Sequence, residues 1–116
     1  MQVLIVGGAG YIGSHMVKLL CRRGCEVTVL DDLSAGYRDA VLAERFVLGD
    51  LGDLSLLDKI FGANHFDGVM HFASHIQVGE SVRDPAKYYR NNVFKTQCLL
   101  DAMLAHKVNH FIFSAT

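Results

Sequence analysis

The sequence predicts an α/β fold: a doubly wound parallel sheet of five strands, in the order 3-2-1-4-5, with helices on both faces. Three observations predict it. Short apolar runs alternate with segments of helical periodicity, which is the pattern of strand–helix–strand units. The first apolar run, residues 3–6, leads into a cluster of glycines at residues 7–13. The second run, residues 27–30, ends on the acids Asp31 and Asp32.

Local chemistry predicts each element. Apolar side chains at helical spacing indicate the inner faces of three helices: Ile12, Met16, Leu19 and Leu20; Leu54, Leu57 and Phe61; and Tyr89, Val93, Thr96, Leu100 and Met103 or Leu104. Gly24 ends the first helix, while Asp53 and Asp84 are suitable N-caps for the later two. The expected strands are 3–6, 27–30, 45–50, 67–74 and 108–116, and the expected helices are 12–23, 39–42, 54–61 and 85–105.

The glycine cluster Gly7-Gly8-Ala9-Gly10-Tyr11-Ile12-Gly13 indicates a dinucleotide site. Glycine supplies the backbone angles of a tight turn. A side chain at Gly10 would keep a pyrophosphate away from the backbone, and one at Gly13 would push the helix off the sheet. The free amides and the positive dipole end of the helix then hold the phosphates. Two registers remain open: Gly8-x-Gly10-x-x-Gly13 and Gly7-x-x-Gly10-x-x-Gly13.

Asp31 is the expected ribose ligand. It lies 18 positions after Gly13, close to the spacing of roughly 20 that is typical of the acid at an adenosine ribose. A carboxylate there accepts hydrogen bonds from both ribose hydroxyls and repels a 2′-phosphate, and Asp32 adds to that repulsion. The sequence therefore predicts NAD rather than NADP, with the adenine beside the loop at residues 33–37.

The ends of the third and fourth strands supply further candidates. Asp50 and Leu51 would flank the adenine, with Asp50 accepting from its amine, but an ordinary turn aspartate is an equal alternative. Ligands bind where the strand order reverses, so the segment after the fourth strand borders the same crevice: Phe72, Ala73, Ser74, His75 and Ile76. His71, within that strand, is expected to be a hydrogen-bonded core residue rather than a catalyst. On the last helix, Asn91 or Asn92 could reach the ligand.

Composition excludes several classes of function. The chain has 116 residues, enough for one domain, and a net charge of −1, so no basic face is available for nucleic acid. No apolar run approaches the roughly 18 residues of a membrane span. The odd number of cysteines, at Cys21, Cys25 and Cys98, fits reduced thiols in a cytoplasmic protein and no metal site.

The chain is expected to be the N-terminal part of a longer protein. Its last residues are the apolar run 108–116, where a crevice wall should lie, and dinucleotide folds normally add a further strand and a substrate-binding part. The alternative is a complete minimal domain of five strands.

These residues resemble the UDP-glucose 4-epimerase family of extended short-chain dehydrogenases/reductases. The resemblance covers the whole chain and rests on these stretches: residues 7–15 with the glycine motif, Asp31-Asp32-Leu33, Gly49-Asp50-Leu51, His71-Phe72-Ala73, Val78-Gly79-Glu80-Ser81-Val82, Tyr88-Tyr89-Arg90-Asn91-Asn92-Val93 and Phe111-Ile112-Phe113-Ser114.

The resemblance implies tightly held NAD. The cofactor residues that it implies, together with those derived above, are Gly7, Gly10, Tyr11, Ile12, Gly13, Asp31, Asp32, Leu33, Ser34, Ala35, Gly36, Asp50, Leu51, Phe72, Ala73, Ser74, His75, Ile76 and Asn91. Thr116 matches the hydroxyl that contacts the sugar's 4-hydroxyl. Some family members carry a lysine where this chain has Ile76. The full-length protein is expected to be a homodimer that acts on a UDP-hexose, interconverting UDP-galactose and UDP-glucose by transient oxidation at C4.

The family's catalytic Tyr-x-x-x-Lys is missing. Four positions after the four tyrosines stand His15, Val41, Asn92 and Val93. We therefore expect these 116 residues to have no turnover by themselves. Two other functions remain open: another nucleotide-sugar enzyme of the superfamily, such as a dehydratase, a decarboxylase or a different epimerase, or a non-catalytic NAD-binding module.

Overall fold

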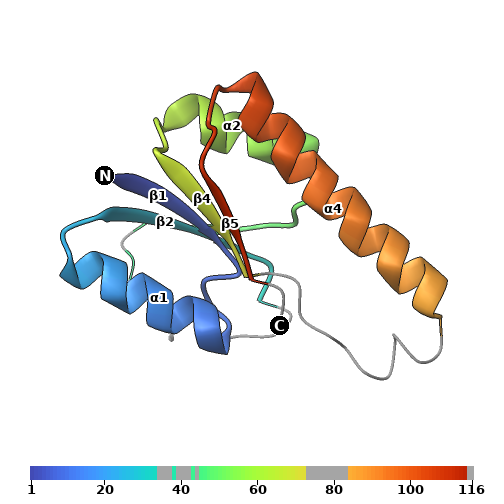
Figure 1. Cartoon of the computed structure of the whole chain (residues 1–116), viewed down its shortest axis with the longest axis horizontal. Coiled ribbons are helices and arrows are strands. Elements are labelled where there is room, and N and C mark those ends of the chain that lie inside the picture. The colour runs from blue at the N-terminus through green and yellow to red at the C-terminus, as the bar shows by residue number, and fades with distance from the viewer. Residues whose placement is uncertain (34–37, 39–42, 44, 73–83, 115–116) are drawn as a thin grey trace.

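The protein forms one parallel sheet of five strands in the order β3-β2-β1-β4-β5, as predicted (Figure 1). The strands are β1 Gln2–Val6, β2 Glu26–Asp31, β3 Arg45–Leu48, β4 Gly68–His71 and β5 Phe111–Phe113, and the helices are α1 Tyr11–Arg22, α2 Leu54–Ala63 and α4 Pro85–Ala105. This computed structural model describes residues 1–33, 38, 43, 45–72 and 84–114, without the side chains of residues 88, 89 and 91.

The register brings the ends of three strands together. Val6, the last residue of β1, lies opposite Leu30 of β2 on one side and His71 of β4 on the other. The chain moves from β1 outward through β2 to β3 and then crosses back to β4, so the strand order reverses between β1 and β4. In an open α/β sheet this is the edge at which ligands bind.

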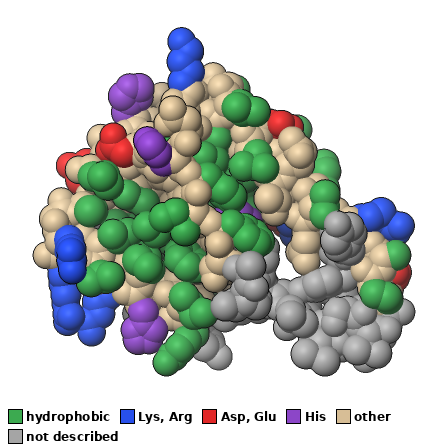
Figure 2. All heavy atoms as spheres, in the orientation of Figure 1, with side chains coloured by type: hydrophobic (Ala, Val, Ile, Leu, Met, Phe, Trp, Pro, Cys, Tyr) green, Lys and Arg blue, Asp and Glu red, His purple; other side chains and the backbone are tan. Residues whose placement is uncertain are grey.

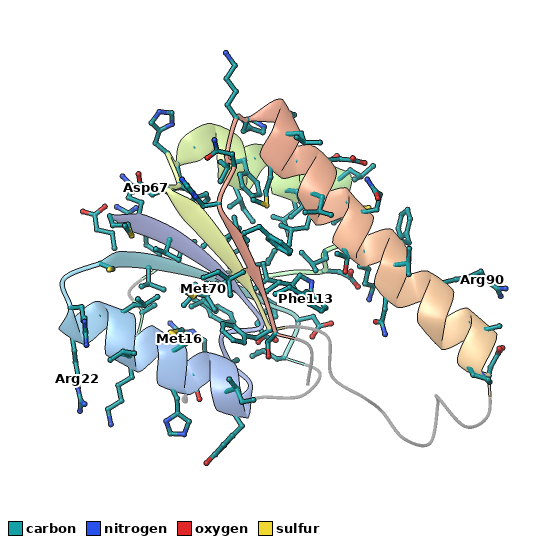
Figure 3. The ribbon with its side chains drawn as sticks, viewed as in Figure 1. Met16, Arg22, Asp67, Met70, Arg90 and Phe113 are labelled. Carbon is teal, nitrogen blue, oxygen red and sulfur yellow. The ribbon has the colours of Figure 1, made fainter. Side chains whose placement is uncertain are left out.

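The two faces of the sheet carry separate cores. On one face, Val17 of α1 packs with Val3, Ile5, Val27 and Val29, all of which are buried. Met16 of α1 and Met70 of β4 belong to this same face (Figure 3).

The opposite face is covered by α2 and α4. Its buried residues include Leu4, Leu30 and Val69 from the sheet, Leu57, Ile60 and Phe61 from α2, and Cys98, Leu99 and Met103 from α4. Alternate residues of each strand therefore face different helices, as expected for strands buried on both sides.

The residues predicted to cap the helices do so in the structure. Oδ1 of Asp53 accepts from the backbone N–H of Leu56 at 3.1 Å, and Oδ1 of Asp84 accepts from that of Lys87 at 3.1 Å. Gly24 follows α1 with φ +81°. Such a left-handed residue suits glycine because it has no Cβ.

Three strands are shorter than the sequence predicts. β3 ends at Leu48, since Asp50 begins a turn, and β4 runs from Gly68 to His71. β5 covers only 111–113, because Lys107 has φ +60° and the N–H of Val108 bonds back to the carbonyl of Met103 in α4. The expected short helix 39–42 and residues 73–74 of the expected fourth strand lie outside the described residues.

The predicted inner faces of the helices are partly wrong. Ile12 and Leu19 of α1 and Leu54 of α2 are exposed, and in α4 Val93 is 48% exposed. Of the two alternatives near the end of α4, Met103 is buried and Leu104 is 76% exposed. Leu57 and Phe61 of α2 are buried as predicted, and the buried residues that the prediction missed are Val17 in α1, Ile60 in α2, and Cys98 and Leu99 in α4. These helices carry apolar residues on more than one side, so periodicity alone did not determine which side meets the sheet.

Hydrophobic side chains also gather on the outer surface on the side that carries α1 (Figure 2). At the edge of the sheet, Ile112 and Phe113 of β5 are 57% and 44% exposed. Within the part of the chain that the structure describes, no helix combines the length and the apolar character that a bilayer span needs.

Leu99→Ala tests the corrected inner face of α4. Leu99 is fully buried and Leu104, on the same helix, is 76% exposed. We expect Leu99→Ala to lower the free energy of unfolding by about 2–5 kcal/mol, because it leaves a cavity. Leu104→Ala, the matched control, should change it by less than about 0.5 kcal/mol. Chemical denaturation followed by circular dichroism measures both, and equal losses would contradict this packing.

Candidate functional site

A tight turn joins β1 to α1 at the edge where the strand order reverses. Gly7 has φ +84°, and its N–H donates to the carbonyl of Leu30 at 2.8 Å. Its own carbonyl accepts from the N–H of Gly10 at 3.2 Å, and the carbonyl of Gly10 accepts from the N–H of Ser14 at 2.9 Å. This chain of bonds sets the start of α1 directly beyond the end of β1.

The surroundings of the turn's glycines differ in whether they leave room for a side chain. A Cβ on Gly13 would lie 2.2 Å from the carbonyl oxygen of Gly7, so the backbone of α1 passes too close to the turn for any side chain. A Cβ on Gly8 would lie 2.7 Å from Val29 Cγ1. Of the described atoms, a Cβ on Gly10 would meet only the carbonyl oxygen of Gly7, at 3.5 Å, which is ordinary contact.

This geometry favours one of the two registers. Gly7, Gly10 and Gly13 form the turn itself, while Gly8 is required by packing against β2. The operative spacing is therefore Gly7-x-x-Gly10-x-x-Gly13. Among the described residues, only the turn's own carbonyl lies near a Cβ at Gly10, so their packing does not require this glycine. A glycine here would allow a ligand to approach the backbone closely.

The N-terminus of α1 is suited to an anion. Its N-cap is Gly10, which has no side chain to cap the helix, and its first turn contains no acidic residue. The amides of a first helical turn have no partner within the helix. They therefore remain available as donors, at the positive end of the helix dipole. Tyr11 and Ile12, the first two residues, are 82% and 45% exposed.

Asp31 links the end of β2 to the glycine turn. Its Oδ2 accepts from the N–H of Ala9 at 2.8 Å, and its Oδ1 accepts from the N–H of Leu33 at 2.8 Å. Leu33 has φ +63°, which is uncommon for a residue with a side chain and typical of functional loops. The carboxylate is thus held by two backbone amides at the edge where the strand order reverses, and each oxygen retains a lone pair for a further donor.

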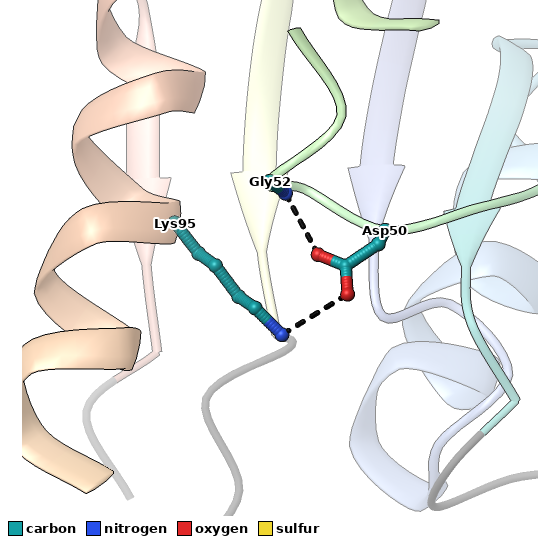
Figure 4. A network of polar contacts seen from close by, with 3 residues as sticks. All are labelled: Asp50, Gly52 and Lys95. Atoms are coloured by element: carbon teal, nitrogen blue, oxygen red, sulfur yellow. Dashed lines mark hydrogen bonds and ion pairs between the residues drawn. The ribbon is translucent and has the colours of Figure 1, made fainter. Parts of the chain in front are cut away.

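Asp50 also holds a turn, after β3. Its Oδ1 accepts from the N–H of Gly52 at 2.7 Å, and its Oδ2 lies 3.2 Å from Nζ of Lys95 on α4 (Figure 4). The turn aspartate that the sequence left as an alternative is therefore present. The ion pair with Lys95 was not predicted.

The remaining predicted residues are only partly described. Leu51 is 6% exposed and belongs to the core beneath α4, and Phe72 donates its N–H to the carbonyl of Val6 at 2.7 Å. Asp32 is exposed. These candidates lie outside the described residues: Ser34, Ala35, Gly36, Ala73, Ser74, His75, Ile76, Thr116 and the side chain of Asn91.

His71 is buried as predicted, but its ring nitrogens form no hydrogen bond with the described residues. It is 2% exposed, and neither Nδ1 nor Nε2 has a partner among those residues. Its ring lies beside those of Phe111 and Phe113 of β5, with centroid distances of 6.2 and 5.2 Å. Burial lowers the pKa of the imidazole, and a contact with its own backbone opposes this only in part.

The cysteines give no metal site among the described residues. Cys25 and Cys98 are free thiols, and no group of three or more potential metal ligands forms in the described ranges.

Two features of the site carried no signal in the sequence. Ala9 takes part through its backbone N–H, which no side-chain motif records. Lys95 lies 45 positions after Asp50, on a helix of which many other polar residues face solvent. Only the packing of α4 beside the Asp50 turn brings the two together.

The sheet order and the glycine turn define a nucleotide-binding α/β protein of the Rossmann type. The family described as "NAD dependent epimerase/dehydratase family" matches residues 3–116, and the chain belongs to it.

Known proteins confirm the resemblance over the whole chain. UDP-glucose 4-epimerase of Halalkalibacterium halodurans is 48% identical over 116 residues, which are 100% of this chain and 35% of that protein. The structure of UDP-glucose 4-epimerase from Brucella ovis in complex with NAD superimposes with a TM-score of 0.90 at 49% identity, over 97% of this chain and 34% of that one. The structure of UDP-glucose 4-epimerase from Thermotoga maritima with UDP-glucose superimposes with a TM-score of 0.93 at 35% identity, over 100% of this chain and 38% of that one. The chain spans about a third of the length of the curated relatives it matches.

Gly13→Ala tests the close approach of α1 to the turn. The new Cβ would overlap the carbonyl oxygen of Gly7, so we expect the free energy of unfolding to fall by about 1–3 kcal/mol. Gly10→Ala is the control: Gly10 has φ −75°, which any residue adopts, and the variant should be no less stable than the parent. Thermal and urea unfolding of both proteins measure the difference, and a neutral Gly13→Ala would contradict the geometry.

Because His71 is buried, we expect the protein to lose stability in mild acid. Because burial lowers its folded-state pKa below the ordinary 6.5, the unfolded chain binds more protons below about pH 6.5, and the free energy of unfolding falls as the pH falls. His71→Phe should flatten this slope between about pH 5 and 7. The control is His65→Phe, at an exposed position, which should retain the parent's slope. An unchanged slope in His71→Phe would assign the acid sensitivity to other groups.

Proposed function

We propose that this chain binds NAD and forms the cofactor part of an enzyme that interconverts UDP-glucose and UDP-galactose. The observation that carries this proposal is the contrast between two glycines of one turn. Gly13 is required by the fold, whereas a Cβ on Gly10, at the N-terminus of α1, would make only an ordinary contact of 3.5 Å with the described residues. A backbone without a side chain lets a pyrophosphate approach closely, and the amides of the first helical turn can donate hydrogen bonds to it.

The described residues fit the rest of an adenosine dinucleotide. We assign the pyrophosphate to the start of α1, near Tyr11 and Ile12, and the ribose hydroxyls to the unused lone pairs of Asp31. A fixed carboxylate at this place also repels a 2′-phosphate, which favours NAD over NADP. Asp50 and Leu51 would flank the adenine, with Asp32 and Leu33 on the adenosine side.

Further contacts rest on the family resemblance. In this proposal the nicotinamide half meets Phe72, Ala73, Ser74, His75 and Ile76, the adenosine half also meets Ser34, Ala35 and Gly36, and Asn91 reaches the cofactor from α4. Thr116 would offer its hydroxyl to the 4-hydroxyl of the sugar.

The chemistry follows from the family. A bound NAD would supply the hydride acceptor for oxidation at C4 of the sugar and, once reduced, the hydride donor for the opposite face of C4. This chain's part is to bind the cofactor, to hold its adenosine end through fixed carboxylates, and to place Thr116 near the 4-hydroxyl. The proton of that hydroxyl needs a base such as the tyrosine of Tyr-x-x-x-Lys, which these 116 residues do not contain. We therefore expect the 116-residue chain to bind NAD without turning over a UDP-hexose.

Three wider proposals concern the whole protein. We propose that it acts on a UDP-hexose, since relatives of this chain are UDP-glucose 4-epimerases and one was crystallised with UDP-glucose.

We propose that it is a homodimer. Val93 and Phe94 of α4 are 48% and 56% exposed, which supports a contact between this helix and a second copy of the chain. We propose a cytoplasmic location, supported by the free thiols of Cys25 and Cys98.

Gly10→Ala tests the cofactor site. A Cβ at this position would displace the pyrophosphate, so we expect the affinity for NAD to fall by about ten- to a hundredfold, with no loss of stability. Isothermal titration calorimetry with NAD and with NADP measures the affinity and the expected preference for NAD.

The matched control is Gly62→Ala on α2, where the nearest described atom that a Cβ would meet outside the helix's own backbone is His106 Cε1, at 3.9 Å. This variant should bind NAD like the parent. Failure of the folded parent to bind NAD, or equal binding by Gly10→Ala, would overturn the proposal.

A further inference from the structure

Lys95 reaches the candidate adenine site from a distant part of the chain. Its Nζ lies 3.2 Å from Oδ2 of Asp50, across the space between α4 and the turn that follows β3 (Figure 4). The other oxygen of the same carboxylate accepts from the N–H of Gly52 at 2.7 Å. Each carboxylate oxygen therefore has one defined partner, and the plane of the carboxylate is set by two different elements.

The middle of α4 holds this turn in two ways. Phe94, next to Lys95, packs over Gly52, since a Cβ on Gly52 would lie 3.6 Å from Cε2 of its ring. Beneath the turn, Leu51 is buried in the core that includes Cys98 and Leu99 of α4. The backbone of the turn is thus already anchored by apolar packing. Lys95 is therefore not needed to hold the backbone of the turn. It contacts the carboxylate of Asp50.

The ion pair is too exposed to matter much for folding. The side chains of Lys95 and Asp50 are 38% and 49% exposed, and pairs in such positions contribute little to stability because water and salt screen them. Its physical consequence is local. It restricts the rotation of the Asp50 carboxylate and places a positive charge beside a negative one at the edge of a site that is proposed to bind an anion.

We propose that Lys95 is a positioning residue of the NAD site. It holds the carboxylate of Asp50 in the orientation that accepts the amino group of adenine, and it offsets the repulsion between this carboxylate and the anionic dinucleotide. A carboxylate has about four lone-pair sites, so the bonds to Gly52 and Lys95 leave room for the adenine amine. This inference rests on the proposed NAD binding and assigns Lys95 a part in it.

Lys95→Met tests the role, because methionine keeps much of the side-chain length and removes the charge. We expect the affinity for NAD to fall by about two- to fivefold at low salt, which is the range of an exposed ion pair. Lys95→Arg should restore the affinity, since a guanidinium also pairs with a carboxylate. The loss should shrink as the salt concentration rises from about 0.05 M to about 1 M. Lys87→Met, at an exposed position of the same helix, is the matched control and should bind like the parent.

Two readouts separate positioning from a merely structural effect. In the background of Asp50→Asn, Lys95→Met should have much less effect, because Lys95 acts through that carboxylate. Nicotinamide hypoxanthine dinucleotide carries a carbonyl in place of the adenine amine. Lys95→Met should therefore weaken binding of NAD more than binding of this analogue.

The outcomes distinguish the two proposals. A parent protein that fails to bind NAD would overturn the proposed function and this inference with it. A parent that binds NAD while Lys95→Met binds equally well at low salt would overturn the role of Lys95 alone. The same holds if the loss persists undiminished in Asp50→Asn or is equal for both dinucleotides.

Discussion

The close passage of α1 over the carbonyl of Gly7 is the constraint on which the site depends. No side chain fits at Gly13, since its Cβ would overlap that oxygen, so the helix can start immediately beyond β1. This approach lets Val17 pack into the core with Val29 of β2. It also places the amides of the first turn at the edge where β1 and β4 end. The packing of α1 and the position of the candidate anion site therefore depend on the same backbone contact.

Two carboxylates at this edge are fixed by backbone amides before any ligand arrives. Asp31 accepts from Ala9 and Leu33, and Asp50 accepts from Gly52. Preorganised acceptors lose less entropy when a ligand binds than freely rotating ones do. The positive φ of Leu33 belongs to the same arrangement, because it turns the chain so that its N–H reaches Asp31. Structural and ligand-binding roles of these acids are thus compatible.

Sequence reasoning was right where the signal was local. Caps at Asp53, Asp84 and Gly24 need only neighbouring backbone groups, and the strand order followed from buried strands that alternate with helices. It was wrong where the local pattern allowed more than one face of a helix to be the buried one. Helix α4 carries apolar residues on more than one side, and only the sheet decided that Leu99 rather than Val93 is buried. The ends of β3 and β5 were set by a turn and by a helix terminus, not by hydrophobicity.

The sequence by itself determined the sheet order, the positions of the caps and the turn glycines, because these depend on side-chain periodicity and on backbone angles that few residues adopt. Tertiary structure alone decided which glycine register operates, since Gly8 is explained only by Val29 across the sheet. It also decided that His71 is buried without a hydrogen bond from its ring to the described residues and that Lys95 meets Asp50. These last features join residues far apart in the chain, and such distances become short only when the helices pack on the sheet.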